Sequence, residues 1–223
     1  MSIVISLRNG LLARLAPKEQ RAPLNAGATD VAGSDPVAYV AEQLKRLLAA
    51  TSYVDGHLNY AAIQASSAYL EMEQRVSGLQ KITREQLGDH PSQLAFWINL
   101  YNLLTLHAVI ARRVRRSVTE RFFGLPFFNS AVYLVGGRRF SLDDIEHGLL
   151  RGNRGNPYLP GRQFAAGDPR LAWLVEPMDV RIHFALNCAS TSCPPIGAYS
   201  ADNLDAELDL ATRHHLNQEV GVE

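Results

Sequence analysis

LAFWINLYNLLTLHAVI, residues 94–110, is apolar almost all round when it is wound as a helix. This pattern predicts a helix that is buried on most of its faces, with Ser92 as its N-cap. Asn99 and Asn102 are three residues apart and therefore share one face. A buried amide without partners costs about 1–3 kcal/mol, so both side chains need hydrogen bonds. They either tie neighbouring backbone together, or one of them orients a catalytic histidine or donates to an oxyanion.

The segments around this helix indicate the fold class. A helix is expected to begin at Asp35-Pro36, and another to span residues 60–76. Two glycines at 136–137 predict a β-hairpin, and residues 180–187 are predicted to form a strand. The class is therefore α+β, with a helical N-terminal half packed on a small antiparallel sheet. We expect residues 1–34 to be a loosely ordered leader and residues 35–223 to be one domain.

The composition excludes several classes of protein. Hydrophobic residues make up 47% and charged residues 20% of the 223, which excludes a disordered chain. Lys plus Arg and Asp plus Glu are 22 each, so the net charge is zero and a nucleic-acid partner is not expected. No secretory signal or membrane segment stands out, which favours a soluble, cytoplasmic protein without membrane contact.

The two cysteines lie in the most informative stretch, residues 181–195. If residues 180–187 form a strand, alternate side chains share a face. One face then carries the apolar side chains and Cys188, which is interpreted as a small buried hydrophobe. The opposite face carries Arg181, His183 and Asn187. This parity disfavours a direct pair between Cys188 and His183.

Cys193 follows a Ser/Thr-rich loop and precedes two prolines that stiffen the chain. Backbone N–H groups of such a loop could lower the pKa of a thiol or stabilise an oxyanion. Four interpretations remain open: Cys193 as a nucleophile with His183 as base, a structural pair with Cys188, a redox disulfide, and a metal site. No spacing typical of metal ligands supports the last of these, and no cofactor is expected.

The stretch SLDDIEHGLLR, residues 141–151, contains further polar candidates. Asp143 and Asp144 are explained by the electrostatics of a helix start. Glu146 and His147 are adjacent and diverge by about 100° on an α-helix, so they are not expected to serve one site together. His147 and Arg151 share a side, where the arginine is expected to pair with a carboxylate.

Three motifs together resemble the domain-of-unknown-function family number 547. They are WINLYN at residues 97–102, SLDDIEH at residues 141–147, and RIHFALNC at residues 181–188 running into SCPP at residues 192–195. The resemblance covers roughly residues 85–220, following the order of these motifs along the chain. It implies a distant similarity to papain-like and transglutaminase-like cysteine enzymes. Related plant domains lie beside coiled coils, which also implies an interaction role.

Two departures qualify what the resemblance implies. Papain-like enzymes carry their nucleophile at the start of the central helix, and this helix contains no cysteine. Family members also continue into further strands, whereas this chain ends at residues 221–223, so a shortened member is expected.

The leading hypothesis is a thiol-dependent hydrolase or acyl transferase that acts on a peptide or acyl substrate. Cys193 would be its nucleophile, His183 its base, and Asn187 or Asn99 the orienting residue. Further candidate members of the site are Cys188, Asn102, Glu146 and Arg181. The alternatives are a non-catalytic domain that binds a protein partner, and a redox-sensitive cysteine pair.

Overall fold

The computed structural model describes residues 2–27, 35–51, 53–54, 57–114, 117–119, 124–190 and 193–219. The α-helices are α1 (Ser2–Leu15), α2 (Pro36–Ala49), α3 (Tyr60–Gln64), α4 (Ser67–Arg75), α5 (His90–Ala111), α6 (Leu125–Ser130) and α7 (Leu204–Glu219). The strands are β1 (Tyr53–Val54), β2 (His57–Leu58), β3 (Val132–Val135) and β4 (Arg138–Ser141). Short 3₁₀ helices are η1 (Lys18–Gln20), η2 (Val76–Lys81), η3 (Glu85–Leu87), η6 (Pro169–Trp173) and η7 (Val180–Phe184), and η5 (Asp144–Leu150) is a π-helix.

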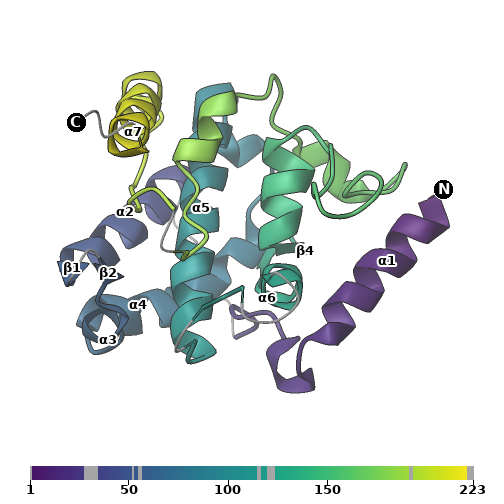
Figure 1. Cartoon of the computed structure of the whole chain (residues 1–223), viewed down its shortest axis with the longest axis horizontal. Helices are drawn as coiled ribbons and strands as arrows, with labels where there is room; N and C mark the ends of the chain where they lie inside the picture. Colours follow the sequence, from purple (N-terminus) through teal and green to yellow (C-terminus); the bar gives the residue numbers. More distant parts are fainter. Residues whose placement is uncertain are drawn as a thin grey trace.

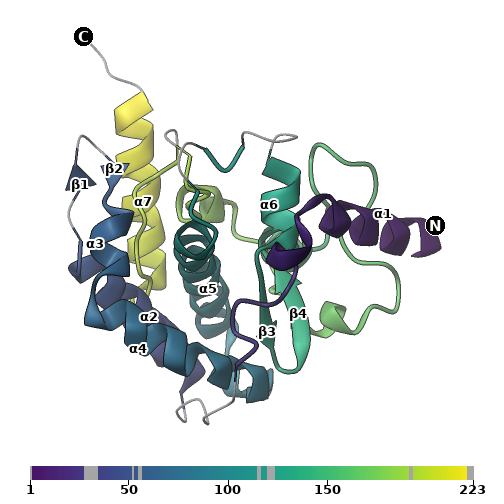
Figure 2. The same ribbon diagram turned by 90° about the horizontal axis from the view of Figure 1, so that it is seen from below.

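Helix α5 runs through the middle of the molecule (Figure 1). Helices α2, α3, α4 and α7 lie on one side of it, and the β3–β4 hairpin with α6 and α1 lies on the other (Figure 2). Every residue of α5 from Leu94 to Ile110 is buried, so the central buried helix is confirmed. Its N-cap is Asp89 rather than Ser92, because the Asp89 carboxylate accepts the N–H of Ser92 at 3.1 Å and Pro91 occupies the first turn.

By length and composition alone, α5 could cross a membrane. Core helices of soluble proteins pass the same test, and 94% of its most apolar 18-residue window is buried inside the fold. Its apolar composition is therefore accounted for by the packing of α2 and the hairpin around it.

The predicted hairpin is confirmed. Strands β3 and β4 pair antiparallel, with Val132 opposite Ser141 and Val135 opposite Arg138. The turn uses Gly136 and Gly137 at φ values of 54° and 70°, which glycine adopts without strain. With β1–β2 as a second small antiparallel pair, the α+β class is confirmed.

The helix predicted over residues 60–76 is broken into α3 and α4. The break lies at Ser66, whose hydroxyl accepts the N–H of Tyr69 at 3.2 Å and so caps α4. Serine competes for backbone groups in this way, which makes it more favourable at a cap than inside a helix.

The strand predicted over residues 180–187 is wrong. Residues 180–184 form η7, which begins where the Asp179 carboxylate accepts the N–H of Arg181 at 2.9 Å. A strand needs a neighbouring strand to satisfy its backbone, whereas this turn satisfies its own through bonds such as Leu186 N–H to the Ile182 carbonyl at 3.0 Å. The alternation of side chains inferred for a strand therefore does not apply. Cys188 is half-buried rather than part of the core.

The segment predicted to be a loosely ordered leader contains α1. Arg8 donates to the carbonyls of Pro160 and Arg162, and Asn9 donates to the carbonyl of Gln163 at 2.7 Å. Residues 28–34 and 220–223 lie outside the described residues. The division into leader and domain stays a prediction.

Candidate functional site

Asn102 of α5 bonds to the backbone on both sides of the loop from Cys188 to Cys193, here called the cysteine loop. Its amide nitrogen donates to the carbonyls of Ala185 at 3.0 Å and Gly197 at 3.2 Å. Its amide oxygen accepts the N–H of Asn187 at 2.9 Å. One buried side chain thus joins the segment before the cysteines to the segment after them, and its position is fixed by the most buried helix of the fold.

Asn99, three residues earlier, makes a reciprocal pair with Tyr199. Its amide nitrogen donates to the Tyr199 carbonyl at 2.7 Å, and its oxygen accepts the Tyr199 N–H at 2.8 Å. Both asparagines are fully buried and satisfied by backbone groups. This arrangement matches the structural network that was one of the two interpretations of these residues.

Cys188 and Cys193 are joined by a disulfide, with their Cα atoms 6.3 Å apart. The N–H of Cys188 donates to the sulfur of Cys193 at 3.3 Å, and the N–H of Cys193 donates to the carbonyl of Ser190 at 3.1 Å. Thr191 and Ser192, the latter part of a predicted motif, lie outside the described residues. The structure therefore brings together the two cysteines that strand parity had separated.

The side chain of Asn187 bonds to the backbone at both ends of the cysteine loop. Its amide nitrogen donates to the Pro194 carbonyl at 2.6 Å, while its oxygen accepts the N–H of Ala189 at 2.8 Å. Ala189 has a φ of 59°, the left-handed region that favours glycine. The side chain of Asn187 therefore supports a turn that places the two sulfurs within bonding distance.

His183 is exposed on η7, five residues before Cys188. Partial burial and the positive charge of Arg151 lower the pKa of His183 below its ordinary value, which favours a neutral imidazole. Within the described part of the chain, no hydrogen bond joins His183 to Cys193. Their pairing as base and nucleophile stays a prediction.

A second cluster of polar side chains lies between α5 and the π-helix η5. Tyr101 of α5 donates to Glu146 at 3.1 Å, and burial raises the pKa of Glu146. Nδ1 of His147 lies 3.6 Å from Glu146 and 2.9 Å from Arg151. Neighbouring residues of a π-helix still leave it in different directions, but the long side chains of Glu146 and His147 meet at their tips, so the expectation that they do not share a site is wrong. The shared side of His147 and Arg151 is confirmed.

Asp143 is a buried acid, which the expected role at a helix start did not predict. Burial, and next the negative charges of Glu146 and Asp144, raises the pKa of Asp143 to about 7. Its carboxylate accepts from Asn129 at 2.6 Å and Asn156 at 3.3 Å. Of the two acids expected at the helix start, Asp144 has that role: it accepts the N–H of Ser141 at 3.0 Å, and the Ser141 hydroxyl accepts the N–H of Asp144 at 3.1 Å. Apolar residues on both sides of the acidic pair were the available signal that Asp143 is buried.

His147 lies beside Asp143, with Nε2 3.7 Å from the carboxylate. Burial, and then the positive charges of Arg151 and His183, lowers the pKa of His147 to about 3. At neutral pH this histidine is therefore uncharged, and the Arg151 donor requires Nδ1 of its ring to accept.

Arg181 forms ion pairs that connect two elements of the fold. Its guanidinium bonds to Asp179 at 2.7 Å, Asp205 at 2.8 Å and Asp209 at 2.6 Å, which ties η7 to α7. Among the residues that the structure describes, no group of three or more His, Cys, Asp and Glu side chains could hold a metal ion.

Comparison with known proteins gives one match. A family model, "Protein of unknown function, DUF547", matches residues 85–216, which include all the predicted site residues. No curated protein and no solved structure matches the chain. The match runs from η3 into α7, covers more than half of the chain and confirms the resemblance drawn from the three motifs. The chain belongs to the DUF547 family.

Proposed function

We propose that the loop from Cys188 to Cys193 is a thiol–disulfide site that exchanges with external thiols and responds to their redox state. The observation that carries this proposal is the disulfide itself, formed within a loop that Asn102 and Asn187 hold on both sides. A short loop held in this way keeps the two sulfurs near each other after reduction, so the bond can re-form.

The exchange balances with an external disulfide of a small thiol or a protein as oxidant. One cysteine thiolate attacks a sulfur of that disulfide, the external S–S bond breaks, and one external thiolate leaves. The second cysteine then attacks the mixed disulfide, forms the bond between Cys188 and Cys193, and releases the second external thiolate. Two electrons and two protons pass from the protein to the external pair, which ends as two thiols.

We place this chemistry in the cytoplasm. Disulfides in a reducing compartment are usually transient and serve redox sensing or catalysis rather than permanent cross-linking. The partner is then a thiol-bearing small molecule or peptide, and neither a metal nor a cofactor takes part.

The test is a redox titration in mixtures of reduced and oxidised glutathione. The protein is quenched with acid, alkylated and weighed by mass spectrometry. We expect both cysteines to change together in one two-electron transition, with a tenfold change in equilibrium constant for about 30 mV. A pair that stays reduced at every ratio would contradict the proposal. So would a disulfide that resists dithiothreitol, or a stable glutathione adduct on one cysteine.

Asn187→Ala tests whether the hydrogen bonds of the Asn187 side chain hold the cysteine loop in the conformation that favours the disulfide. Losing the bonds to Ala189 and Pro194 should lower the effective concentration of one thiol at the other about tenfold, raising the midpoint potential by about 30 mV. Asn203→Ala, on an exposed turn outside the loop, is the control that should leave the midpoint unchanged.

Acyl chemistry of the reduced protein is a second candidate. The Cys188 N–H reaches the Cys193 sulfur, and the lowered pKa of His183 favours a neutral base. We expect reduced protein to release a burst of nitrophenol from p-nitrophenyl acetate that Cys193→Ala abolishes and Cys188→Ala retains. Stable variants at Cys193 and His183 with no change in any reaction would instead favour the non-catalytic interaction domain.

A further inference from the structure

Helix α1 lies at the edge of the molecule and has apolar side chains on its outward face (Figure 1). We call this row of four residues the apolar stripe: Val4, Leu7, Leu11 and Leu15. Their spacing of three and four residues places them within about 80° of one another around the helix axis. They are between 44% and 68% exposed. Surface helices normally turn polar side chains to water, so a continuous exposed apolar row indicates a contact with something outside this chain.

The opposite face of α1 is packed against the protein. Ile5, Leu12 and Ala16 are buried, and α1 lies beside α6 in both views (Figure 2). Asn9 also donates to the Gln163 carbonyl at 2.7 Å. Helix α1 therefore has two apolar faces, and the described part of the chain covers one of them. The fold holds the apolar stripe outward.

The loop that receives the bonds from α1 adds an exposed aromatic side chain. Arg8 donates to the carbonyls of Pro160 and Arg162, and Tyr158 in the same loop is 77% exposed. Tyrosine combines an apolar ring with a polar hydroxyl, and it is enriched where proteins meet the interface between a membrane and water. An exposed aliphatic row next to such a loop fits a helix that lies in the plane of a lipid surface.

The same two segments are basic. Residues 1–27 and 152–163 together contain one acidic residue, Glu19, against six basic residues. The six are Arg8, Arg14, Lys18, Arg21, Arg154 and Arg162. Because the whole chain has no net charge, the rest of the protein is net negative. The side of the molecule that carries the apolar stripe is therefore complementary in charge to an anionic surface.

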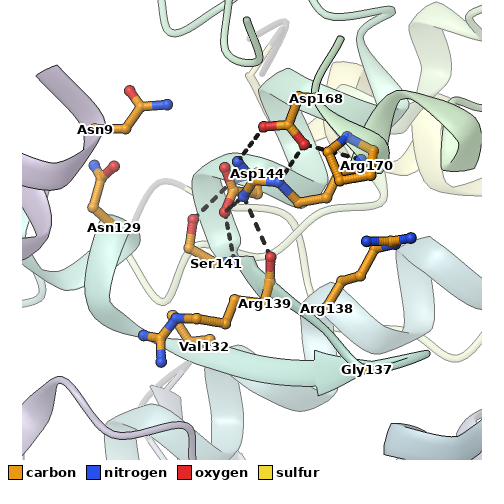
Figure 3. Close-up of a pocket in the computed structure, with 11 residues that line it drawn as sticks. Asn9, Asn129, Val132, Gly137, Arg138, Arg139, Ser141, Asp144, Asp168 and Arg170 are labelled. Carbon is orange, nitrogen blue, oxygen red and sulfur yellow. Dashed lines mark hydrogen bonds and ion pairs between the residues drawn. The ribbon is translucent and has the colours of Figure 1, made fainter. Parts of the chain in front are cut away.

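The β3–β4 hairpin beside α1 adds two more arginines. Figure 3 shows Asn9 of α1 across a cavity from the arginines of this region. Arg170 is already paired with two aspartates of the cavity wall. Arg138 and Arg139 are exposed, have no carboxylate within ion-pair distance among the described residues, and point in different directions. They do not converge on one small anion, but a lipid surface presents many separate headgroups and requires no convergence.

A second copy of this chain fits the apolar stripe less well. Two stripes facing each other would bury on the order of 800 Å² in total, below the roughly 1,200 Å² at which stable interfaces begin. The pairing would also bring two basic surfaces together, since Arg14 and Lys18 are exposed near one end of the stripe. Area and charge therefore both favour an anionic lipid surface.

We propose that α1 and the loop of residues 152–163 dock on an anionic lipid surface. The apolar stripe and Tyr158 enter the headgroup region, and the surrounding basic side chains bind the headgroups. The sequence gave no reason to expect membrane contact because no spanning segment stands out, and a peripheral contact of this kind needs none. No residue of the cysteine loop takes part, so the proposal does not rest on thiol–disulfide exchange.

The test is cosedimentation of the full chain with vesicles of phosphatidylcholine alone, and with vesicles that also contain about 30 mol% phosphatidylserine. We expect binding to the anionic vesicles to be at least about tenfold tighter than to the neutral ones, and to weaken as salt is raised, because salt screens the charges. No binding to the anionic vesicles, or equal binding to both kinds, would overturn the proposal.

Leucine variants locate the apolar part of the contact. Leu7→Gln and Leu11→Gln should each weaken binding about tenfold, because each removes one aliphatic side chain from the lipid contact while glutamine keeps the helix. Leu70→Gln is the matched control, since Leu70 is 56% exposed on α4, on the other side of α5, and should leave binding unchanged (Figure 2). Equal binding by all three variants would refute the docking of α1. The thermal unfolding of each variant verifies that its fold is retained.

A charge variant and a mass measurement complete the test. Arg14→Gln should weaken binding to the anionic vesicles about fivefold, whereas Arg75→Gln, at an exposed position of α4, should not change it. Light scattering of the free protein reports whether copies associate instead. A dimer that Leu11→Gln dissociates would assign the apolar stripe to a second copy and overturn the proposal.

Discussion

Replacing Asn102 with alanine is expected to lower the free energy of unfolding by about 3 kcal/mol, because three hydrogen bonds from a fully buried side chain to backbone groups are lost. The groups left behind belong to Ala185, whose bond is buried, and to Asn187 and Gly197, whose bonds are partly buried. Urea unfolding of the wild type and the variant measures the difference. The same substitution should loosen the cysteine loop, so the midpoint of its disulfide should become less reducing.

Thr105→Val is the matched control for Asn102→Ala. Thr105 lies one turn further along α5 and is equally buried, but its hydroxyl has no hydrogen-bond partner among the described residues. Removing that hydroxyl should change stability by less than about 1 kcal/mol and leave the disulfide midpoint in place. If the two variants lost the same stability, the effect would come from disturbing the core. The stabilising role assigned to the three hydrogen bonds of Asn102 would then be refuted.

Replacing Asp143 with asparagine should change how stability depends on pH. Burial raises the pKa of Asp143 from 3.8 to about 7, so the folded protein holds this proton more tightly than the unfolded chain does. The resulting stability is fully present below about pH 4 and is lost as the pH rises through 7. Relative to wild type, Asp143→Asn should therefore gain on the order of 4 kcal/mol between pH 4 and pH 8.

His147 affects the pH dependence of the free energy of unfolding in the opposite direction. Its pKa is lowered from 6.5 to about 3, so its contribution is present above pH 6.5 and is lost as the pH falls through 3. In the wild type this loss and the contribution of Asp143 offset each other between about pH 4 and 6.5. Asp143→Asn removes the offset, so the variant should lose stability on acidification where the wild type changes little.

Chemical unfolding at a series of pH values from 4 to 8 checks both expectations for Asp143→Asn. Asparagine keeps an oxygen for the donors Asn129 and Asn156, so the comparison isolates the ionisation. Asp202→Asn, on an exposed turn, serves as the control for a change in net charge. Parallel stability curves for wild type and Asp143→Asn would contradict the raised pKa.

The candidate site was only partly predictable from the sequence. The asparagines of α5 could be recognised as buried amides that need partners, since they interrupt an apolar run. Their partners lie 83 to 100 residues away along the chain, and no local pattern identifies them. Glu146 and His147 leave the helix in different directions, and the 3.6 Å contact between them depends on how their side chains fold back, which helical rotation alone does not predict.

The amino-acid sequence alone is enough to predict the buried helix α5, the hairpin turn and the helix start at Asp35-Pro36. These features depend on local chemistry: an apolar surface on all sides, two glycines at positive φ, and a side-chain oxygen beside a proline. In contrast, the 3₁₀ helix at residues 180–184 and the pairing of Cys188 with Cys193 depend on contacts that form only in the folded chain. A strand depends on a neighbouring strand and a buried amide on distant backbone, and both partners exist only after the chain has folded.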